Sequence, residues 1–215
     1  MQDLRLCELL AARICHDLVG PVGAVANGVE LMGEDGSGAD AEVVRLVSGS
    51  ARVASRRLQA FRVAFGSANT LPSTGWLGAV RELAQGLVEE GKARLEWPAP
   101  QPGLEAGADK RLAKLILNLV LIAFDSMLRG GTVRVEIAPS EKSTAIVVRG
   151  EGGQGRIVDE VRAGLEGVFD LSSATPKAAP AYLAASLARE LGGVLAVSAD
   201  GTPEFEIRLA IPGRS

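Results

Sequence analysis

The chain has 215 residues, of which 47% are hydrophobic and 23% charged, with a formal net charge of −3. This composition predicts one or two folded domains and excludes a mainly disordered chain. The slightly acidic balance gives no electrostatic footprint for nucleic acid or for an anionic membrane. One histidine and two cysteines without ligand spacing, Cys7 and Cys15, exclude a typical His/Cys metal site and indicate reduced thiols. Charges interrupt the apolar N-terminus, so we expect a soluble cytoplasmic protein without a signal peptide or membrane span.

Apolar side chains recur every three or four residues over residues 2–33, which predicts one long helix. That stripe consists of Leu4, Cys7, Ala11, Ile14, Leu18, Val22, Val25, Val29 and Met32. A second stripe runs from Val43 to Phe65 after the turn sequence GEDGSGAD, so the two helices should form an antiparallel hairpin. One hairpin alone leaves most of each stripe in water, and we therefore expect a homodimer in which two hairpins close into a four-helix bundle.

A Gly-, Ser- and Thr-rich segment at 66–75 predicts a boundary between a helical domain at 1–68 and a second domain at 75–215. The second domain is predicted to contain both helices and strands. Helices are expected over residues 76–90, 108–128 and 179–191, with a loop and short helix after GEGGQG, and strands over ARLEW, TVRVEIA, STAIVVR, VLAVSA and EFEIRLAI. The predicted fold class is α+β, with helices on one face of a mixed sheet.

His16 is the only histidine, and its position on the first helix is informative. It lies about 200° from Ile14 and from Leu18 around the helix, so it should face away from the buried stripe. The residues within about 60° of it are Leu9, Ala12, Arg13, Gly20, Gly23, Ala24 and Asn27. Glycine costs about 1 kcal/mol in a helix interior. Such small residues on an exposed face indicate that another backbone approaches closely. A helix broken at Gly20-Pro21, or a surface histidine without a role, is the alternative.

An exposed imidazole is substantially neutral near physiological pH and can act as a nucleophile through one ring nitrogen. The adjacent Asp17 is placed to orient the other nitrogen, although a carboxylate there is also an ordinary solvated charge. Pro21 removes the backbone hydrogen bond to Asp17 and predicts a kink. Arg13, one turn before His16, either contacts a partner or is a surface arginine.

These residues match a known pattern. The stretch CHDLVGP resembles the H-box of sensor histidine kinases, which lies on the first helix of a dimeric bundle. KLILNLVLIAFDSM is similar to their N-box, EGGQG to the glycine-rich G1 box, LARELGGVLAV to the helix and strand after the G2 box, and PEFEIRLAIP to the closing strand. The resemblance covers nearly the whole chain and implies a helical hairpin followed by a histidine-kinase-type (Bergerat) α/β sandwich.

The ATP-binding boxes depart from that pattern. Asn118 matches the first N-box asparagine, but the second falls on Ile122, which offers Mg²⁺ no oxygen ligand. The G2-box glycines fall on Ala178 and Pro180, and proline lacks the N–H that a phosphate cradle uses. The G1-box aspartate falls on Glu151 or Gly150, according to register. We therefore expect a degenerate ATP site.

A histidine on a dimeric bundle without a working ATP site resembles the kinase-like histidine phosphotransferases of alphaproteobacterial phosphorelays. The resemblance implies that His16 takes a phosphoryl group from the receiver aspartate of a hybrid kinase and passes it to response regulators, including a cell-cycle transcription factor. It implies His16 and Asp17 as the catalytic residues, with Arg13, Gly20, Gly23, Ala24 and Asn27 contacting the receiver. It also implies no cofactor on this chain, because the receivers bring the Mg²⁺. Gly20 stands where kinases carry the Thr/Asn that positions water for phosphatase action.

Three other readings stay open at this point. The chain could be an ATP-dependent histidine kinase with a divergent pocket, which saturable ATP binding would reveal. It could be a non-catalytic module that docks on kinases or receivers, which phosphate on His16 would exclude. Finally, GEGGQG after an apolar strand matches a dinucleotide-binding fingerprint, although the preceding strands read as an antiparallel pair.

Overall fold

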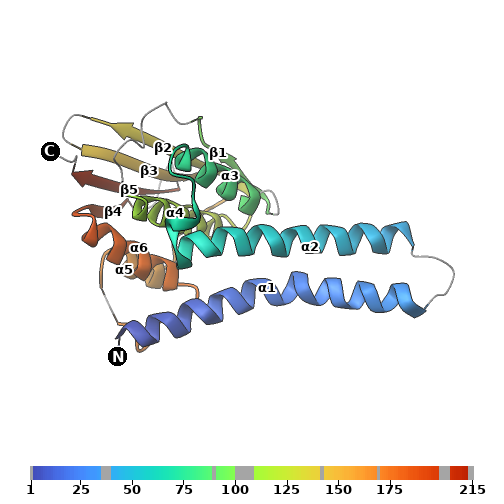
Figure 1. Ribbon diagram of the computed structural model, residues 1–215. Coiled ribbons are helices and arrows are strands. Elements are labelled where there is room, and N and C mark those ends of the chain that lie inside the picture. Colours follow the sequence, from blue (N-terminus) through green and yellow to red (C-terminus); the bar gives the residue numbers. More distant parts are fainter. Residues whose placement is uncertain are drawn as a thin grey trace.

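The computed structural model describes residues 2–34, 40–88, 91–99, 109–140, 143–168, 170–198 and 204–212. Two long antiparallel helices, α1 (Gln2–Glu34) and α2 (Ala41–Phe61), form an arm that projects from an α/β domain (Figure 1). This confirms the predicted hairpin. Most of the turn predicted at GEDGSGAD lies outside the described residues. Asp40 immediately precedes α2, and its side chain accepts a hydrogen bond from the Glu42 amide at 2.9 Å and so caps the helix.

Helix α1 continues without interruption through Pro21, so the alternative of two shorter helices is wrong. The end of α2 was not foreseen. It passes into a π-helical turn, η1 (Arg62–Gly66), in which the rings of Phe61 and Phe65 stack with centroids 5.1 Å apart. A short 3-10 turn, η2 (Ala68–Thr70), then leads into the second domain, where Leu71 is buried and its carbonyl accepts a hydrogen bond from Lys110 at 2.9 Å. The exact division at 68–75 stays a prediction.

The second domain is an α/β sandwich. Its elements are α3 (Trp76–Val88), β1 (Ala93–Glu96), α4 (Arg111–Ser126), β2 (Gly131–Pro139), β3 (Ser143–Glu151), α5 (Asp159–Leu165), α6 (Ala179–Glu190), β4 (Val194–Ser198) and β5 (Phe205–Pro212). The strand order is β1-β2-β3-β5-β4, with β1 parallel to β2 and the other pairs antiparallel. The predicted mixed sheet is confirmed. Because β3 is antiparallel to both neighbours, the loop GEGGQG does not open a parallel βαβ unit and the dinucleotide reading is wrong.

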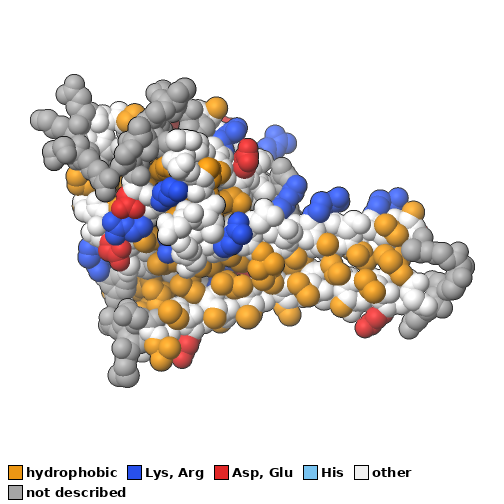
Figure 2. All heavy atoms as spheres, in the orientation of Figure 1, with side chains coloured by type: hydrophobic (Ala, Val, Ile, Leu, Met, Phe, Trp, Pro, Cys, Tyr) orange, Lys and Arg blue, Asp and Glu red, His pale blue; other side chains and the backbone are white. Residues whose placement is uncertain are grey.

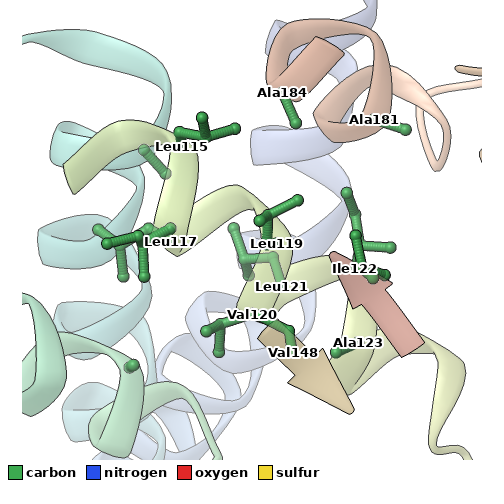
Figure 3. Close-up of a cluster of buried hydrophobic side chains, with 14 of the residues drawn as sticks. Leu115, Leu117, Leu119, Val120, Leu121, Ile122, Ala123, Val148, Ala181 and Ala184 are labelled. Atoms are coloured by element: carbon green, nitrogen blue, oxygen red, sulfur yellow. The ribbon is translucent and has the colours of Figure 1, made fainter. Parts of the chain in front are cut away.

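Helix α4 is the centre of the core. Its residues from Leu115 to Ala123 are buried all around the helix, which is typical of a helix enclosed by other elements. Figure 3 shows these side chains pointing to several sides at once, with Ala181 and Ala184 of α6 and Val148 of β3 around them. The core extends into the hairpin through Leu9 of α1, which is 3% exposed. The base of the hairpin is therefore anchored on the second domain.

The other face of the sheet carries paired charges. Arg149 on β3 bonds Glu136 at 2.8 Å and Glu206 at 2.5 Å, and Arg208 also bonds Glu206 at 2.5 Å. Arg134 on β2 pairs with Glu96 on the neighbouring strand at 2.8 Å. Such cross-strand pairs suit a solvated sheet face. The core therefore lies between the sheet and the helices on one side, as predicted.

The hairpin presents much of its apolar surface to solvent. Figure 2 shows hydrophobic side chains in a band along both helices. Leu4, Val22 and Val29 of the first stripe are 67%, 53% and 55% exposed, and Leu58 of α2 is 51% exposed. Near the base, Cys7, Leu10, Ala11, Ile14, Leu58, Phe61 and Phe65 contribute to a groove of about 630 Å³. The expectation that one hairpin leaves its stripe in water is confirmed.

By length and composition alone, one helix in the described part of the chain is long and apolar enough to cross a membrane: Leu4–Gly33 of α1. The N-terminal third of that stretch, however, contacts the second domain. Arg13 within it forms an ion pair with Asp125 of α4 at 2.6 Å. This part of α1 therefore packs against the α/β domain.

Candidate functional site

His16 lies on α1 where this helix passes the second domain, and its side chain is 84% exposed. Its Nδ1 atom is 3.0 Å from Oδ1 of Asp17. Because a carboxylate oxygen only accepts hydrogen bonds, Nδ1 must carry the proton in this contact. The nucleophilic lone pair is then on Nε2 of an exposed ring. The predicted roles of His16 and Asp17 are both compatible with this geometry.

Asp17 is held in place by Arg13. The Nε atom of Arg13 donates to Oδ2 of Asp17 at 2.7 Å, and its Nη2 atom lies 2.6 Å from Oδ2 of Asp125 on α4. Burial by itself lowers the pKa of the Arg13 guanidinium, but the carboxylates of Asp125 and Asp17 outweigh this effect and the net pKa is raised. Arg13 therefore stays charged and bridges two carboxylates.

The backbone carbonyl of Asp17 also receives a hydrogen bond from outside α1. Pro21 has no N–H to donate to the carbonyl of Asp17, one helical turn earlier. Nη1 of Arg57, from α2, donates to that carbonyl at 2.5 Å. The second helix of the hairpin thus satisfies the acceptor that the proline exposes, which explains how α1 continues past Pro21.

The predicted outward face of α1 needs one correction. Leu9 and Arg13 were expected to face solvent with His16, but they are 3% and 9% exposed. The second domain covers this end of the face, because Leu9 packs into its core and Arg13 reaches α4. Arg13 is therefore not a surface arginine.

The other end of the face is open. Gly20, Ala12 and Asn27 are exposed, and Gly23 and Ala24 are partly buried. A Cβ atom built on Gly20 or on Gly23 would have no neighbouring atom within 4 Å. Packing within the chain thus gives no reason for glycine at either position. The small residues leave room beside His16.

A cleft of about 400 Å³ opens next to the imidazole. It lies between α1, the end of α4 and the segment before α6, and its lining is Arg13, His16, Asp17, Asp125, Leu128, Thr175, Pro176 and Lys177. Sequence reasoning missed five lining residues, Asp125, Leu128, Thr175, Pro176 and Lys177. It also missed the contact of Arg57 with the carbonyl of Asp17. Asp125 carried one signal, because it is an acidic residue at the end of the otherwise apolar run LILNLVLIAF.

Most of the residues that match the ATP-binding boxes lie in the core, whereas Glu151 on β3 is partly exposed and pairs with Arg134 at 3.2 Å. Ile122, Ala178 and Pro180 are buried. Nδ2 of Asn118 donates to the carbonyls of Ala64 at 2.9 Å and Lys114 at 2.7 Å, which joins α4 to the π-helical turn. Beside Ile122 a space of only about 10 Å³ remains, lined also by Val158 and Val161. Nowhere in the described ranges do three or more His, Cys, Asp or Glu side chains gather as metal ligands.

Comparisons with known proteins identify the family of the chain. The family model of the histidine phosphotransferase C-terminal domain matches residues 77–203. The protein phosphotransferase ChpT of Brucella abortus (strain 2308) is 35% identical over 157 residues, which are 73% of this chain and 72% of ChpT. The chain belongs to the histidine phosphotransferase family.

Solved structures agree with this membership. A bacterial phosphotransferase solved at 1.7 Å superposes with a TM-score of 0.74 at 29% identity, covering 96% of each chain. The blue-light activated histidine kinase EL346 of Erythrobacter litoralis has a TM-score of 0.51 at 14% identity, covering 93% of this chain and 59% of the kinase. The phosphotransferase thus shares the arrangement of a helical hairpin and an α/β sandwich with histidine kinases. The predicted fold class and family resemblance are confirmed.

Proposed function

We propose that this phosphotransferase accepts a phosphoryl group on His16 from the phosphorylated aspartate of a hybrid-kinase receiver domain and passes it to receiver domains of response regulators, including a regulator of the cell cycle. The observation that carries the proposal is the pairing of Nδ1 of His16 with Asp17 on a ring that is 84% exposed. No other histidine in the chain competes for the role.

The transfer step is a displacement at phosphorus. Nε2 of His16 attacks, the N–P bond forms, and the O–P bond of the receiver's aspartyl phosphate breaks. The electron pair of that bond leaves with the receiver carboxylate, and the Nδ1 proton stays in its hydrogen bond to Asp17. Asp17 stabilises the positive charge that develops on the ring. The reverse step delivers the phosphoryl group to the next receiver. Mg²⁺ enters with the receivers, and this chain contributes the imidazole.

The surface around His16 suits a receiver. The open small-residue face at Gly20, Gly23, Ala24 and Asn27 lets another backbone approach, and in-line transfer requires close placement of the donor. Across the cleft, Lys177 brings a positive charge to the region that a phosphoryl group would enter. Leu128, 74% exposed at the rim, offers an apolar contact.

We propose further that the phosphotransferase does not bind ATP as a kinase would. Ligand pockets for drug-sized molecules have volumes of about 300–1,000 Å³. The space beside Ile122 is about 10 Å³, and filling it with ATP would require the buried side chains of Ile122 and Val161 to move. No cofactor is proposed for this chain.

The exposed apolar band of the hairpin supports a homodimer. The groove near the base of α1 and α2 has about 630 Å³ of space lined mainly by apolar side chains. A second hairpin presents the same chemistry, so two copies bury it in a four-helix bundle. The ion pair between Arg13 and Asp125 favours a cytoplasmic location over membrane insertion of α1.

Two labelling reactions test the proposal. Wild type and His16→Ala are incubated with a phosphorylated receiver domain of a hybrid kinase from the same organism, and separately with Mg-ATP. The proposal predicts label on wild type from the receiver, none on the variant, and none from ATP. Label from ATP alone would make the protein a kinase, and no label from either donor would make it a docking module.

A further inference from the structure

We infer that Asp125 of α4 is a positioning residue for His16. Acting through Arg13 and Asp17, it holds the imidazole with Nδ1 protonated and Nε2 presented outward, so the second domain forms part of the phosphoacceptor site. The acceptor role of His16 itself rests on the proposed function. The orientation of the ring does not, because it is a property of the chain alone.

Three contacts connect Asp125 to the ring in one line. Asp125 lies 2.6 Å from Nη2 of Arg13, Nε of Arg13 donates to Oδ2 of Asp17 at 2.7 Å, and Oδ1 of Asp17 is 3.0 Å from Nδ1 of His16. Each carboxylate oxygen of Asp17 thus has a separate partner. The inner members are shielded while the ring is open: the Arg13 side chain is 10% exposed, Asp17 15%, and His16 84%.

Without Asp125, the pair of Arg13 and Asp17 would be an ordinary helix pair four residues apart. Such pairs in solvent contribute only about 0.3–0.5 kcal/mol and do not fix two long side chains in one geometry. Asp125 engages Nη2 of the guanidinium from α4, and Arg13 contacts Asp17 through Nε, with a single hydrogen bond to Oδ2. This arrangement keeps Oδ1 of Asp17 available to His16.

Removal of the Asp125 charge has a definite geometric consequence. A guanidinium that has lost one carboxylate prefers to grip the remaining one with two parallel hydrogen bonds. Arg13 would then take both oxygens of Asp17, and the contact to Nδ1 would weaken. The imidazole would be released to exchange between its two tautomers, and a protonated Nε2 cannot attack phosphorus.

A purely structural role for Asp125 is the competing explanation, and other contacts already supply that role. Leu9 anchors α1 in the core of the second domain, and Nε of Arg5 donates to the carbonyl of Leu171 at 3.3 Å. Burial raises the pKa of the Asp125 carboxyl. The charge of Arg13 opposes this rise but does not cancel it, so the net pKa is raised. Because ionising a buried carboxylate costs free energy, an apolar contact would hold α1 on the second domain equally well or better.

The test uses the ring itself as the probe. Because the full chain has one histidine, a long-range ¹H–¹⁵N spectrum of ¹⁵N-histidine protein reports the two nitrogens of His16 without assignment. We compare wild type, Asp125→Asn and a control, Glu190→Gln, which also removes an ion pair of α4 (Arg111 to Glu190, 3.1 Å) but away from His16. Wild type and control should show the Nδ1–H tautomer, and Asp125→Asn a mixture with the Nε2–H form.

Kinetics give the second readout. At saturating phosphorylated receiver, Asp125→Asn should accept phosphate slower by roughly ten- to a hundredfold, with little change in the receiver concentration for half-maximal rate. Arg13→Lys, which keeps the charge but lacks the planar fork, should shift the tautomer in the same direction and serves if Asp125→Asn fails to fold. If Asp125→Asn and Arg13→Lys fold and the tautomer of His16 is unchanged, the inference is overturned and the role of Asp125 is purely structural. A wild type that takes no phosphate would instead refute the proposed function while leaving the tautomer comparison to decide this one.

Discussion

Arg57 of α2 donates to the carbonyl oxygen of Asp17, the same acceptor that Pro21 leaves without its helical donor. The contact couples the two helices of the hairpin directly behind the residue that orients His16. It also explains how a proline is tolerated inside a helix of 33 residues.

This coupling predicts a non-additive effect of two substitutions. Arg57→Met should lower the free energy of unfolding by about 1–3 kcal/mol, because it leaves a carbonyl unsatisfied. In a Pro21→Ala background the helix regains the donor, so the same substitution should cost less there. Urea unfolding of the four proteins measures the difference. Equal costs in both backgrounds would show that Arg57 does not act on this carbonyl.

Gly20→Ala should separate stability from function. A Cβ at Gly20 meets no atom within 4 Å, so the helix should gain about 1 kcal/mol. The added methyl group occupies the face that we assign to the receiver, and phosphotransfer should slow. Gly78→Ala, at an equally open position in α3, is the matched control and should leave transfer unchanged. Faster or equal transfer in Gly20→Ala would remove this face from the proposed contact.

Leu58→Asp should convert the proposed dimer to a monomer. Leu58 lines the apolar groove of the hairpin and is 51% exposed in the single chain, so a charge there costs the fold little but is buried in a four-helix bundle. Light scattering after size exclusion measures the mass. Val168→Asp, at an exposed apolar residue of the second domain, should stay dimeric. A wild type that is monomeric at every concentration would rule the bundle out.

Stability should fall in acid partly through Glu206. Desolvation raises the pKa of this carboxyl, but hydrogen bonds from Arg208 and Arg149 outweigh it and the net pKa lies below its ordinary value of 4.5. The folded state therefore binds fewer protons. The stabilising contribution of Glu206 is full at pH values above 4.5 and is lost as the pH falls from there through the lower pKa of the folded state.

The comparison for this prediction is Glu206→Gln, whose unfolding free energy should decline less than that of wild type between about pH 6.5 and about pH 3.5. Glu190→Gln, which changes an exposed carboxylate, controls for the loss of one charge. Parallel declines in wild type and Glu206→Gln would mean that the arginines do not stabilise the ionised form.

Much of the fold was predictable because apolar spacing repeats over long segments. Period and length identified α1, α2 and α4, and short runs with apolar residues, several of them β-branched, identified the strands. The π-helical turn at Arg62–Gly66 escaped because its apolar residues continue the same spacing as α2. Its cause is tertiary, since Asn118 donates to the carbonyl of Ala64 within the turn.

The candidate site was only half predictable, for a physical reason. His16 and Asp17 are neighbours in sequence, so helix geometry alone relates them. Asp125, Lys177 and Arg57 reach the site from other elements, and their places depend on how α1 packs against the second domain and α2. The expectation of an exposed Arg13 failed because helix periodicity cannot tell which further domain covers a face.

The measurement that tests phosphoryl transfer to His16 most directly is the location of the phosphoryl group after reaction with a phosphorylated receiver. Trapped wild-type protein, labelled with ¹⁵N-histidine, is examined by ³¹P and ¹⁵N NMR, with His16→Gln as the blank. We predict one phosphohistidine with phosphorus on Nε2 and the proton on Nδ1, and no such signal in the variant. Phosphorus on Nδ1, or phosphate on another residue in both proteins, would contradict the role assigned to the His16–Asp17 pair.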